Sequence, residues 1–332
     1  MASGVGPADI GDIGDIGDIG DIGDIGDIGD IGDISAAPGA PTSGMVRPIG
    51  VSPAVHRVPG EDWFRGNKWP PADLASPWRN ASISKTSPTA FPASPWTPQY
   101  YSIAVLGELT QQTVEPTPRG IRTIGGATLR WDTVDLAPIL EAAKVEEELA
   151  ELAALVEYRA GVLAEALVQI NDVLSYFGGV LSFTAGSHPA TYGLAYIAQK
   201  AGEFQVMHYK AKFNRPRATR LCPALMPPIE VPGHAAFPSG HSTQSHLMAL
   251  CLARVMPAAA SAGVNPQTKA ADPDFGPLQR LAERIARNRE VLGMHYPSDS
   301  EAGKQLANAT LPLLMRCPTV QAVARRAKAE WW

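Results

Sequence analysis

The sequence predicts a mainly α fold, a helical bundle that begins after residue 130 and is preceded by an irregular N-terminal arm. Apolar side chains recur with a 3.6-residue period from Asp135 onward, which is typical of helices that bury one face. Prolines and glycines stand between the periodic segments, where helices begin and end. With 332 residues, of which 45% are hydrophobic, the chain can bury a large core.

Residues 1–35 are expected to form a disordered tail. From Asp9 to Ile34 the sequence repeats Asp-Ile-Gly, and this run carries nine aspartates and no basic residue. Low complexity and regular negative charge oppose packing into a core. The repeat also accounts for more than the whole net charge of −5, so the rest of the chain is net positive.

Residues 36–130 are rich in proline, serine and threonine but contain too many tryptophans for a simple linker. We expect an extended arm that wraps the helical domain and is anchored by aromatic rings. The segment Gly120–Trp131 is compatible with a short β-hairpin. The tryptophans of this arm are Trp63, Trp69, Trp78 and Trp96.

Residues 131–332 are expected to form the helical domain. Its first helical stretch, which ends near Gly178, has an apolar stripe on one face and an acidic run that should face solvent. The stripe consists of Leu136, Ile139, Leu140, Ala143, Leu149, Leu152, Leu155 and Val156. The acidic run consists of Glu141, Glu146, Glu147 and Glu148. Further helices are expected at about 190–211, 240–256, 277–291, 299–315 and 319–330, with a loop over 263–277.

The sequence Phe-Pro-Ser-Gly-His at Phe237–His241 precedes one of these apolar helices. Backbone N–H groups are unpaired at a helix N-terminus, and the helix dipole favours an anion there. Gly240 permits a close approach, and Ser239 can cap the helix or donate its hydroxyl to the anion. His241, in the first turn, is placed to exchange a proton with a bound group.

A second group of polar residues surrounds the junction of two later helices. Arg289 is expected near the end of a helix that begins near Pro277 and is broken by Gly293. His295 then lies in the turn, and Asp299 provides an N-cap pattern for the next helix. A carboxylate that accepts the far ring N–H of His295 would fix its tautomer and raise its basicity.

The third segment contains Lys210 and Arg217, which flank a bend. This bend follows a helix that should start near Pro189 and end before Pro216. Arginine matches pairs of oxyanion oxygens with its planar fork, and lysine adds a point charge. The combined pattern of cations, histidines and one carboxylate therefore predicts a tetrahedral oxyanion held beside a histidine. Lys212 and Arg215 are expected to be solvated or to lie at the rim.

These segments together resemble the Lys-x6-Arg-Pro, Pro-Ser-Gly-His and Ser-Arg-x5-His-x3-Asp motifs of the type 2 phosphatidic acid phosphatase and vanadium-dependent haloperoxidase superfamily. The resemblance covers roughly residues 135–318 and implies a helical bundle of that type. It implies that the oxyanion, phosphate or vanadate, is bound by Lys210, Arg217, Ser239, Gly240 and Arg289. His295 would be the phosphohistidine nucleophile or the ligand of vanadium, and His241 the acid/base, with Asp299 completing the catalytic group.

The sequence departs from these motifs at two positions. Ala218 follows Arg217 where the superfamily has proline, while Arg215 does precede a proline. Which arginine faces the anion is therefore open, although the seven-residue step from Lys210 favours Arg217. Asn288 replaces the serine before the third-motif arginine, and asparagine can still donate a hydrogen bond.

The same site suits two reactions, because vanadate resembles the transition state of phosphoryl transfer. A haloperoxidase would bind vanadate as cofactor and use halide and peroxide, whereas a phosphatase would need no cofactor and hydrolyse a phosphoester. The aromatic arm and the lack of an export signal favour the soluble bacterial haloperoxidase-like branch. A non-catalytic oxyanion-binding protein is the third alternative, and each motif taken alone also fits a helix cap, a surface charge or a turn histidine.

Other functional classes are disfavoured. No histidine or cysteine set has zinc spacing, and the cations near the two histidines would repel a bare metal ion. The three cysteines are widely spaced and odd in number, which favours free thiols and a reducing compartment. No apolar segment reaches membrane-spanning length, so we expect a cytoplasmic protein without a membrane span or nucleic-acid partner. The oligomeric state is not indicated by the sequence.

Overall fold

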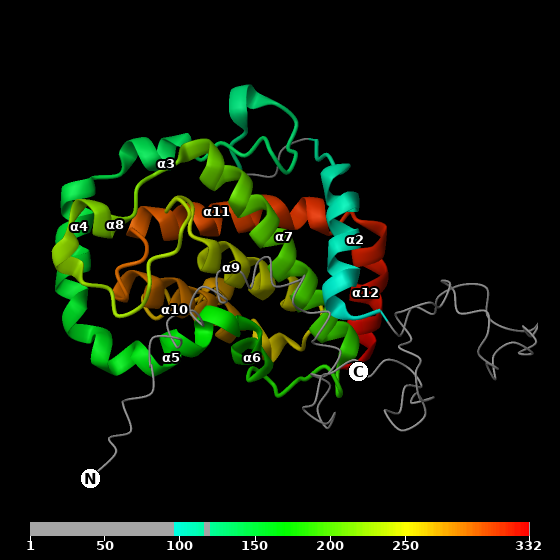
Figure 1. Ribbon diagram of the computed structural model, residues 1–332. Helices are drawn as coiled ribbons and strands as arrows, with labels where there is room; N and C mark the ends of the chain where they lie inside the picture. Colours follow the sequence, from blue (N-terminus) through cyan, green and yellow to red (C-terminus); the bar gives the residue numbers. More distant parts are fainter. Residues whose placement is uncertain (1–95, 116–119, 332) are drawn as a thin grey trace, which may run out of the picture. The chain divides into compact units, whose positions relative to one another are not determined.

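The computed structural model describes residues 96–115 and 120–331, which belong to a compact unit that begins at Trp96. These residues form helices joined by loops, with isolated β-bridges and no longer strand among them (Figure 1). The mainly α fold class is thus confirmed. The predicted tail and three tryptophans of the predicted arm lie outside the described residues. None of the described helices is both long enough and apolar enough to cross a bilayer.

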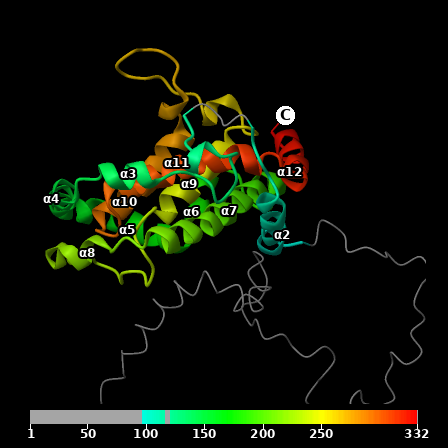
Figure 2. The ribbon, with the colours of Figure 1, turned by 90° about the horizontal axis from the view of Figure 1, so that it is seen from above.

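The bundle is built around α9 (Gly240–Leu252), which is buried along most of its length. Three helices pack against it: α7 (Pro189–Phe213), α10 (Pro277–Val291) and α11 (Pro297–Leu314). Figures 1 and 2 show α9 enclosed by these neighbours. A helix with apolar and small residues all round is stable only inside such a shell, which is why its sequence reads as a buried helix.

Shorter helices cover this core. They are α2 (Pro98–Thr110), α3 (Ala137–Ala142), α4 (Val145–Leu155), α5 (Arg159–Asn171), α6 (Val173–Gly178), α8 (Ala218–Leu221) and α12 (Pro318–Ala329). Proline is the first residue of α2, α7, α10, α11 and α12. A proline costs nothing at that position because the first N–H of a helix has no intrahelical partner. The helix starts could therefore be predicted closely from the sequence.

The first helical stretch is divided where the sequence predicted one continuous stripe. It forms α3, α4, α5 and α6, which follow the surface of the core in turn. α3 packs on α11, α4 and α5 pack on α10, and α6 packs on α7, α9 and α10. The last break is local: the Asp172 carboxylate accepts the backbone N–H of Ser175 at 2.9 Å and caps α6.

Residues 98–110, expected as extended arm, instead form α2 and pack on α7 and α12. Val105 and Leu109 are buried one helical turn apart, which gives this segment an apolar face. Trp96 is 42% exposed and so does not act as a buried anchor. The predicted hairpin near Gly120–Trp131 is reduced to isolated bridges.

Candidate functional site

The three predicted segments meet where four helix ends come together. Lys210 lies in the last turn of α7, Ser239 caps α9, Arg289 lies near the end of α10, and Asp299 lies in the first turn of α11. A backbone hydrogen bond from Ser239 N to Asp299 O, of 2.9 Å, joins two of these segments directly.

The His295–Asp299 pair is the centre of this arrangement. Nδ1 of His295 lies 3.0 Å from Oδ2 of Asp299, and both side chains are buried. The same carboxylate oxygen accepts the backbone N–H of Tyr296 at 3.1 Å, so Asp299 stands at the third position of α11 and Tyr296 is the N-cap residue. Because a carboxylate faces Nδ1, that nitrogen carries the proton and Nε2 keeps its lone pair.

Arg217 faces this lone pair. Its Nη1 lies 3.2 Å from Nε2 of His295 and donates to the Met294 carbonyl at 2.9 Å. Its Nε donates to the His234 carbonyl at 3.0 Å, and its Nη2 lies 3.0 Å from Nδ1 of the same histidine. The structure thus places Arg217, rather than Arg215, beside Nε2 of His295.

Lys210 is a buried cation on the same side. Its Nζ donates to the carbonyls of Ala235 and Ala236, at 2.6 and 3.0 Å. Burial, and secondarily the charge of Arg217, hold the lysine pKa well below its usual value. Burial also lowers the pKa of His295 far below the ordinary imidazole value, with the charges of Arg217 and Lys210 adding to it. His295 is therefore a neutral imidazole.

Arg289 and His241 lie on the side of the site formed by α5. Arg289 donates from Nη2 to the Ala166 carbonyl at 2.5 Å, while its buried Nε has no hydrogen-bond partner among the described residues. Burial lowers the pKa of this arginine to about 10, against the opposing charge of Glu165. Nε2 of His241 donates to the Gln169 carbonyl at 3.0 Å. Burial, followed by the charge of Arg289, lowers the pKa of His241 to about 3.

The loop before α9 has the capping geometry that the sequence predicts. Ser239 is the N-cap residue, and its Oγ accepts the backbone N–H of Ser242 at 3.4 Å. Gly240 is the first residue of the helix, and a Cβ there would meet only a Val206 methyl, at 3.9 Å. The space beside Gly240 can therefore admit the close approach of an anion.

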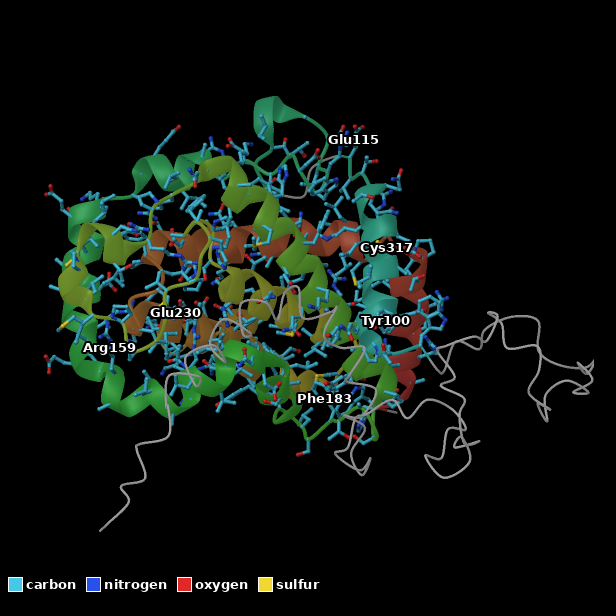
Figure 3. All side chains as sticks on the ribbon, viewed as in Figure 1. Tyr100, Glu115, Arg159, Phe183, Glu230 and Cys317 are labelled. Atoms are coloured by element: carbon cyan, nitrogen blue, oxygen red, sulfur yellow. The ribbon has the colours of Figure 1, made fainter. Side chains whose placement is uncertain are left out.

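Arg159 fixes the turn that carries His295. Figure 3 shows this side chain at the start of α5. It donates to the Val291 carbonyl at 2.9 Å and to the Met226 carbonyl at 2.7 Å. Gly293, which follows α10, has a φ of 77°, and a Cβ there would lie 3.2 Å from the Arg159 guanidinium. The turn therefore requires glycine for both its backbone and its packing.

Positive charge exceeds negative charge among the predicted site residues. Lys210, Arg217 and Arg289 are cations, and Asp299 provides the carboxylate of the pair. Burying like charges side by side is costly unless an anion compensates them. The orphaned Nε of Arg289 also has a donor to offer. The arrangement can therefore hold a group with about two negative charges beside a neutral imidazole nitrogen.

The predicted exposure of two side chains, Arg215 and Glu148, is wrong. Arg215, expected at the rim, has a side chain only 6% exposed and donates to Oδ1 of Asp299 at 2.7 Å. Glu148, expected to face solvent, is 12% exposed and accepts from Arg215 at 2.9 Å. Glu148 lies one helical turn before the buried Leu152, and this spacing could have placed it on the inner face of α4.

Two other polar residues, Asn288 and His246, contact other residues of the bundle. Asn288 donates to Glu165 at 3.1 Å and to Oε1 of Gln169 at 2.9 Å, so it holds α5 against α10. His246 is buried, and its Nδ1 lies 2.7 Å from the Ser242 carbonyl. Lys212 is exposed, as expected.

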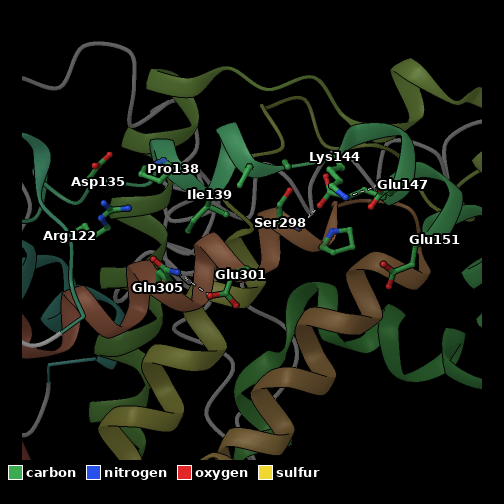
Figure 4. A pocket seen from close by; sticks show the side chains of 14 residues that line it. Arg122, Asp135, Pro138, Ile139, Lys144, Glu147, Glu151, Ser298, Glu301 and Gln305 are labelled. Carbon is green, nitrogen blue, oxygen red and sulfur yellow. Dashed lines mark hydrogen bonds and ion pairs between the residues drawn. The ribbon is translucent and has the colours of Figure 1, made fainter.

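A cavity of about 650 Å³ lies beside the site, between α3, α4 and the start of α11 (Figure 4). Its wall includes Glu148 and Ser298 but none of the predicted anion-binding residues. The cavity therefore borders Glu148 and Ser298, which contact Arg215, and not His295 itself.

Among residues 96–115 and 120–331, no three or more histidine, cysteine, aspartate or glutamate side chains cluster in the manner of metal ligands. The cysteines of this part of the chain are free thiols. Comparison of the sequence with models of known protein families and with curated proteins gave no match.

Proposed function

We propose that the protein is an oxyanion-dependent enzyme and that its oxyanion is vanadate, used in peroxide-dependent halide oxidation of the haloperoxidase type. The observation that carries this proposal is the neutral His295, whose Nδ1 is held by Asp299 while Nε2 lies 3.2 Å from Arg217. A neutral imidazole nitrogen is a suitable ligand for a metal oxyanion, and the surrounding cations suit its oxygens.

Each residue of the site has a defined task in this proposal. Nε2 of His295 would hold vanadate, and Asp299 would keep the ring in the correct tautomer. Lys210, Arg217 and Arg289, which contact backbone carbonyls in the structure, would donate to the oxyanion oxygens. Bound vanadate supplies a Lewis-acidic centre for the activation of peroxide.

In the proposed peroxide chemistry His241 would act as a general base. With a pKa of about 3 its ring is neutral near neutral pH in the anion-free protein, and Nδ1 is the acceptor because Nε2 donates to Gln169. A neutral imidazole can take a proton from hydrogen peroxide as a general base. A phosphatase would instead use the protonated ring, whose pKa a bound phosphate raises, to give a proton to the leaving alkoxide.

The second candidate function is phosphomonoester hydrolysis through a phosphohistidine, and the same His295–Asp299 pair favours it. Nε2 would form a bond to phosphorus as the phosphorus–alkoxide bond breaks, and Asp299 would stabilise the imidazolium that results. Water would then cleave the nitrogen–phosphorus bond and release phosphate.

Parallel assays of the purified protein separate these functions. We expect bromination of an organic acceptor to require hydrogen peroxide, bromide and added vanadate, and to be lost in His295→Ala. Hydrolysis of p-nitrophenyl phosphate without vanadate, lost in the same variant, would instead establish the phosphatase. Anion binding without turnover in either assay would show a binding protein and contradict both enzymatic proposals.

A further inference from the structure

We infer that Arg215 and Glu148 are positioning residues that orient the His295–Asp299 pair, forming a chain from α4 to the reactive imidazole. The inference rests on the proposed function for its effect on turnover, because it assigns His295 the central role. These residues lie far apart in the sequence: Arg215 is 67 residues from Glu148 and 84 residues from Asp299.

Arg215 is held on several sides at once. Its Nη1 donates to Oδ1 of Asp299 and to Oγ of Ser298, both at 2.7 Å, and its Nη2 donates to Glu148 at 2.9 Å. Its guanidinium carbon also lies 3.7 Å from the centre of the Tyr296 ring. A planar guanidinium with its donors engaged and one face stacked has a single orientation.

Arg215 in turn fixes the plane of the Asp299 carboxylate. Oδ1 accepts from Arg215, whereas Oδ2 accepts from Nδ1 of His295 at 3.0 Å and from the backbone of Tyr296 at 3.1 Å. Rotation of the carboxylate would break bonds on both oxygens. The direction of the His295 ring therefore depends on Arg215, which does not itself contact the imidazole through any of these bonds.

Glu148, on α4, is the other end of this hydrogen-bonded series. Its Oε1 accepts the backbone N–H of Ser298 at 2.6 Å, and its Oε2 accepts from Arg215. The carboxylate thus ties the first turn of α11 to the guanidinium and balances its charge. Because Glu148 and Asp299 both pair with Arg215, this cation is committed to holding the carboxylate and is not an oxyanion ligand.

The test compares Arg215→Gln, Arg215→Lys and Glu148→Gln with a matched control, Glu151→Gln. Glu151 lies on the same helix as Glu148 and pairs with Arg287 at 2.7 Å. Its substitution therefore removes an ion pair between α4 and α10 and leaves the contacts of Glu148 and Arg215 in place. Glu148→Gln can keep the acceptor for Ser298 while turning an amide N–H toward Arg215. Turnover is measured from pH 4 to 9, and the tautomer of His295 is measured by ¹⁵N NMR.

We expect Arg215→Gln to lower kcat by about ten- to a hundredfold, the usual cost of losing a residue that orients a ligand. His295 should also lose its single Nδ1-protonated form. Glu148→Gln should change kcat and the tautomer in the same direction by less, and Arg215→Lys should recover part of the loss. Glu151→Gln should leave kcat and the tautomer unchanged.

An unchanged kcat and tautomer in Arg215→Gln, or equal changes in Glu151→Gln, would overturn the inference. If Arg215→Gln does not fold, an unaltered Glu148→Gln overturns it. The NMR measurement does not depend on turnover. A wild-type protein that is inactive in both assays therefore contradicts the proposed function, while the tautomer still decides the role of Arg215 and Glu148.

Discussion

The two site histidines differ in what holds their second ring nitrogen. His295 donates to a carboxylate, whereas His241 donates to the backbone carbonyl of Gln169. A carboxylate stabilises positive charge that develops on the ring, and a neutral carbonyl does so much less. His295 is therefore suited to bond formation through Nε2, and the neutral His241 to accepting a proton from a bound group.

His241 provides a direct spectroscopic prediction. Because burial and Arg289 lower its pKa to about 3, the ring is neutral throughout the physiological range in the anion-free protein. Its C2–H resonance should not shift between pH 5 and 8, and addition of phosphate or vanadate should raise its pKa by placing negative charge nearby. A titration midpoint close to that of a free imidazole would contradict the assigned environment.

At the scale of helices, α11 crosses α9 at Gly303. A Cβ on Gly303 would lie 2.8 Å from the Ser239 carbonyl oxygen and 2.8 Å from Cβ of Ser242. Contact with the backbone of the capping loop cannot be relieved by a side-chain rotation. The glycine therefore sets how closely Asp299, on α11, approaches the loop before α9.

Gly303→Ala should destabilise the protein by about 1–3 kcal/mol, the usual cost of overpacking, and should weaken anion binding. Gly193→Ala is the control. It places the same methyl group on α7, where nothing lies within 4 Å of the new Cβ, and should stabilise by about 0.4–1 kcal/mol. Urea denaturation measures the free energy of unfolding of both variants. Equal values for the two would argue against the close approach of α11 to α9.

A second contact between helices gives a pH-dependent prediction. Glu283 on α10 lies 3.4 Å from Nε2 of His246 on α9 and pairs with Lys304 on α11. The contact with His246, followed by the pairing with Lys304, lowers the Glu283 pKa to about 2. A lowered carboxyl pKa adds stability above about pH 4.5, and this stability is lost as pH falls toward 2.

Glu283→Gln should therefore lower the melting temperature at pH 7 and have little effect near pH 2. The side chain is 50% exposed, so the difference at pH 7 should stay below about 1 kcal/mol. Glu301→Gln on the exposed face of α11 is the control and should have no effect at either pH. An effect of Glu283→Gln that is independent of pH would exclude the ionic contribution.

The sequence could predict the elements that have local signals. Prolines and Gly293 mark helix ends, and three residues named from short sequence segments, Arg217, His295 and Asp299, lie together in the structure. The Arg215–Glu148 pair could not be predicted, because the partners are 67 residues apart and no local pattern links them. The helix α2 was missed because its proline-rich surroundings obscured a short apolar stripe.

For the whole molecule, the site depends on the convergence of helix ends and not on any one motif. The N-termini of α9 and α11 and the C-terminal turns of α7 and α10 contribute side chains to one region. The N-terminal ends add positive partial charge to the buried cations. Anion binding should accordingly stabilise the bundle as a whole, because the anion binds the folded state alone.

Removal of residues 1–34 should leave activity and melting temperature nearly unchanged. The repeat in this segment is acidic and of low complexity, and it supplies no residue of the proposed site. Thermal unfolding and the two activity assays on the shortened protein test this expectation. A fall of several degrees would show that the segment packs against the rest of the chain.

The central claim is that Lys210, Arg217, Arg289 and His295 form a single oxyanion site. Equilibrium binding of vanadate, measured at increasing phosphate concentrations, tests it most directly. We predict strict competition between the two anions. In Arg289→Gln both should bind about ten- to a hundredfold more weakly, because a charge-assisted hydrogen bond contributes roughly 1.5–3 kcal/mol. Independent binding of vanadate and phosphate, or an Arg289 variant that weakens only one of them, would contradict the single site.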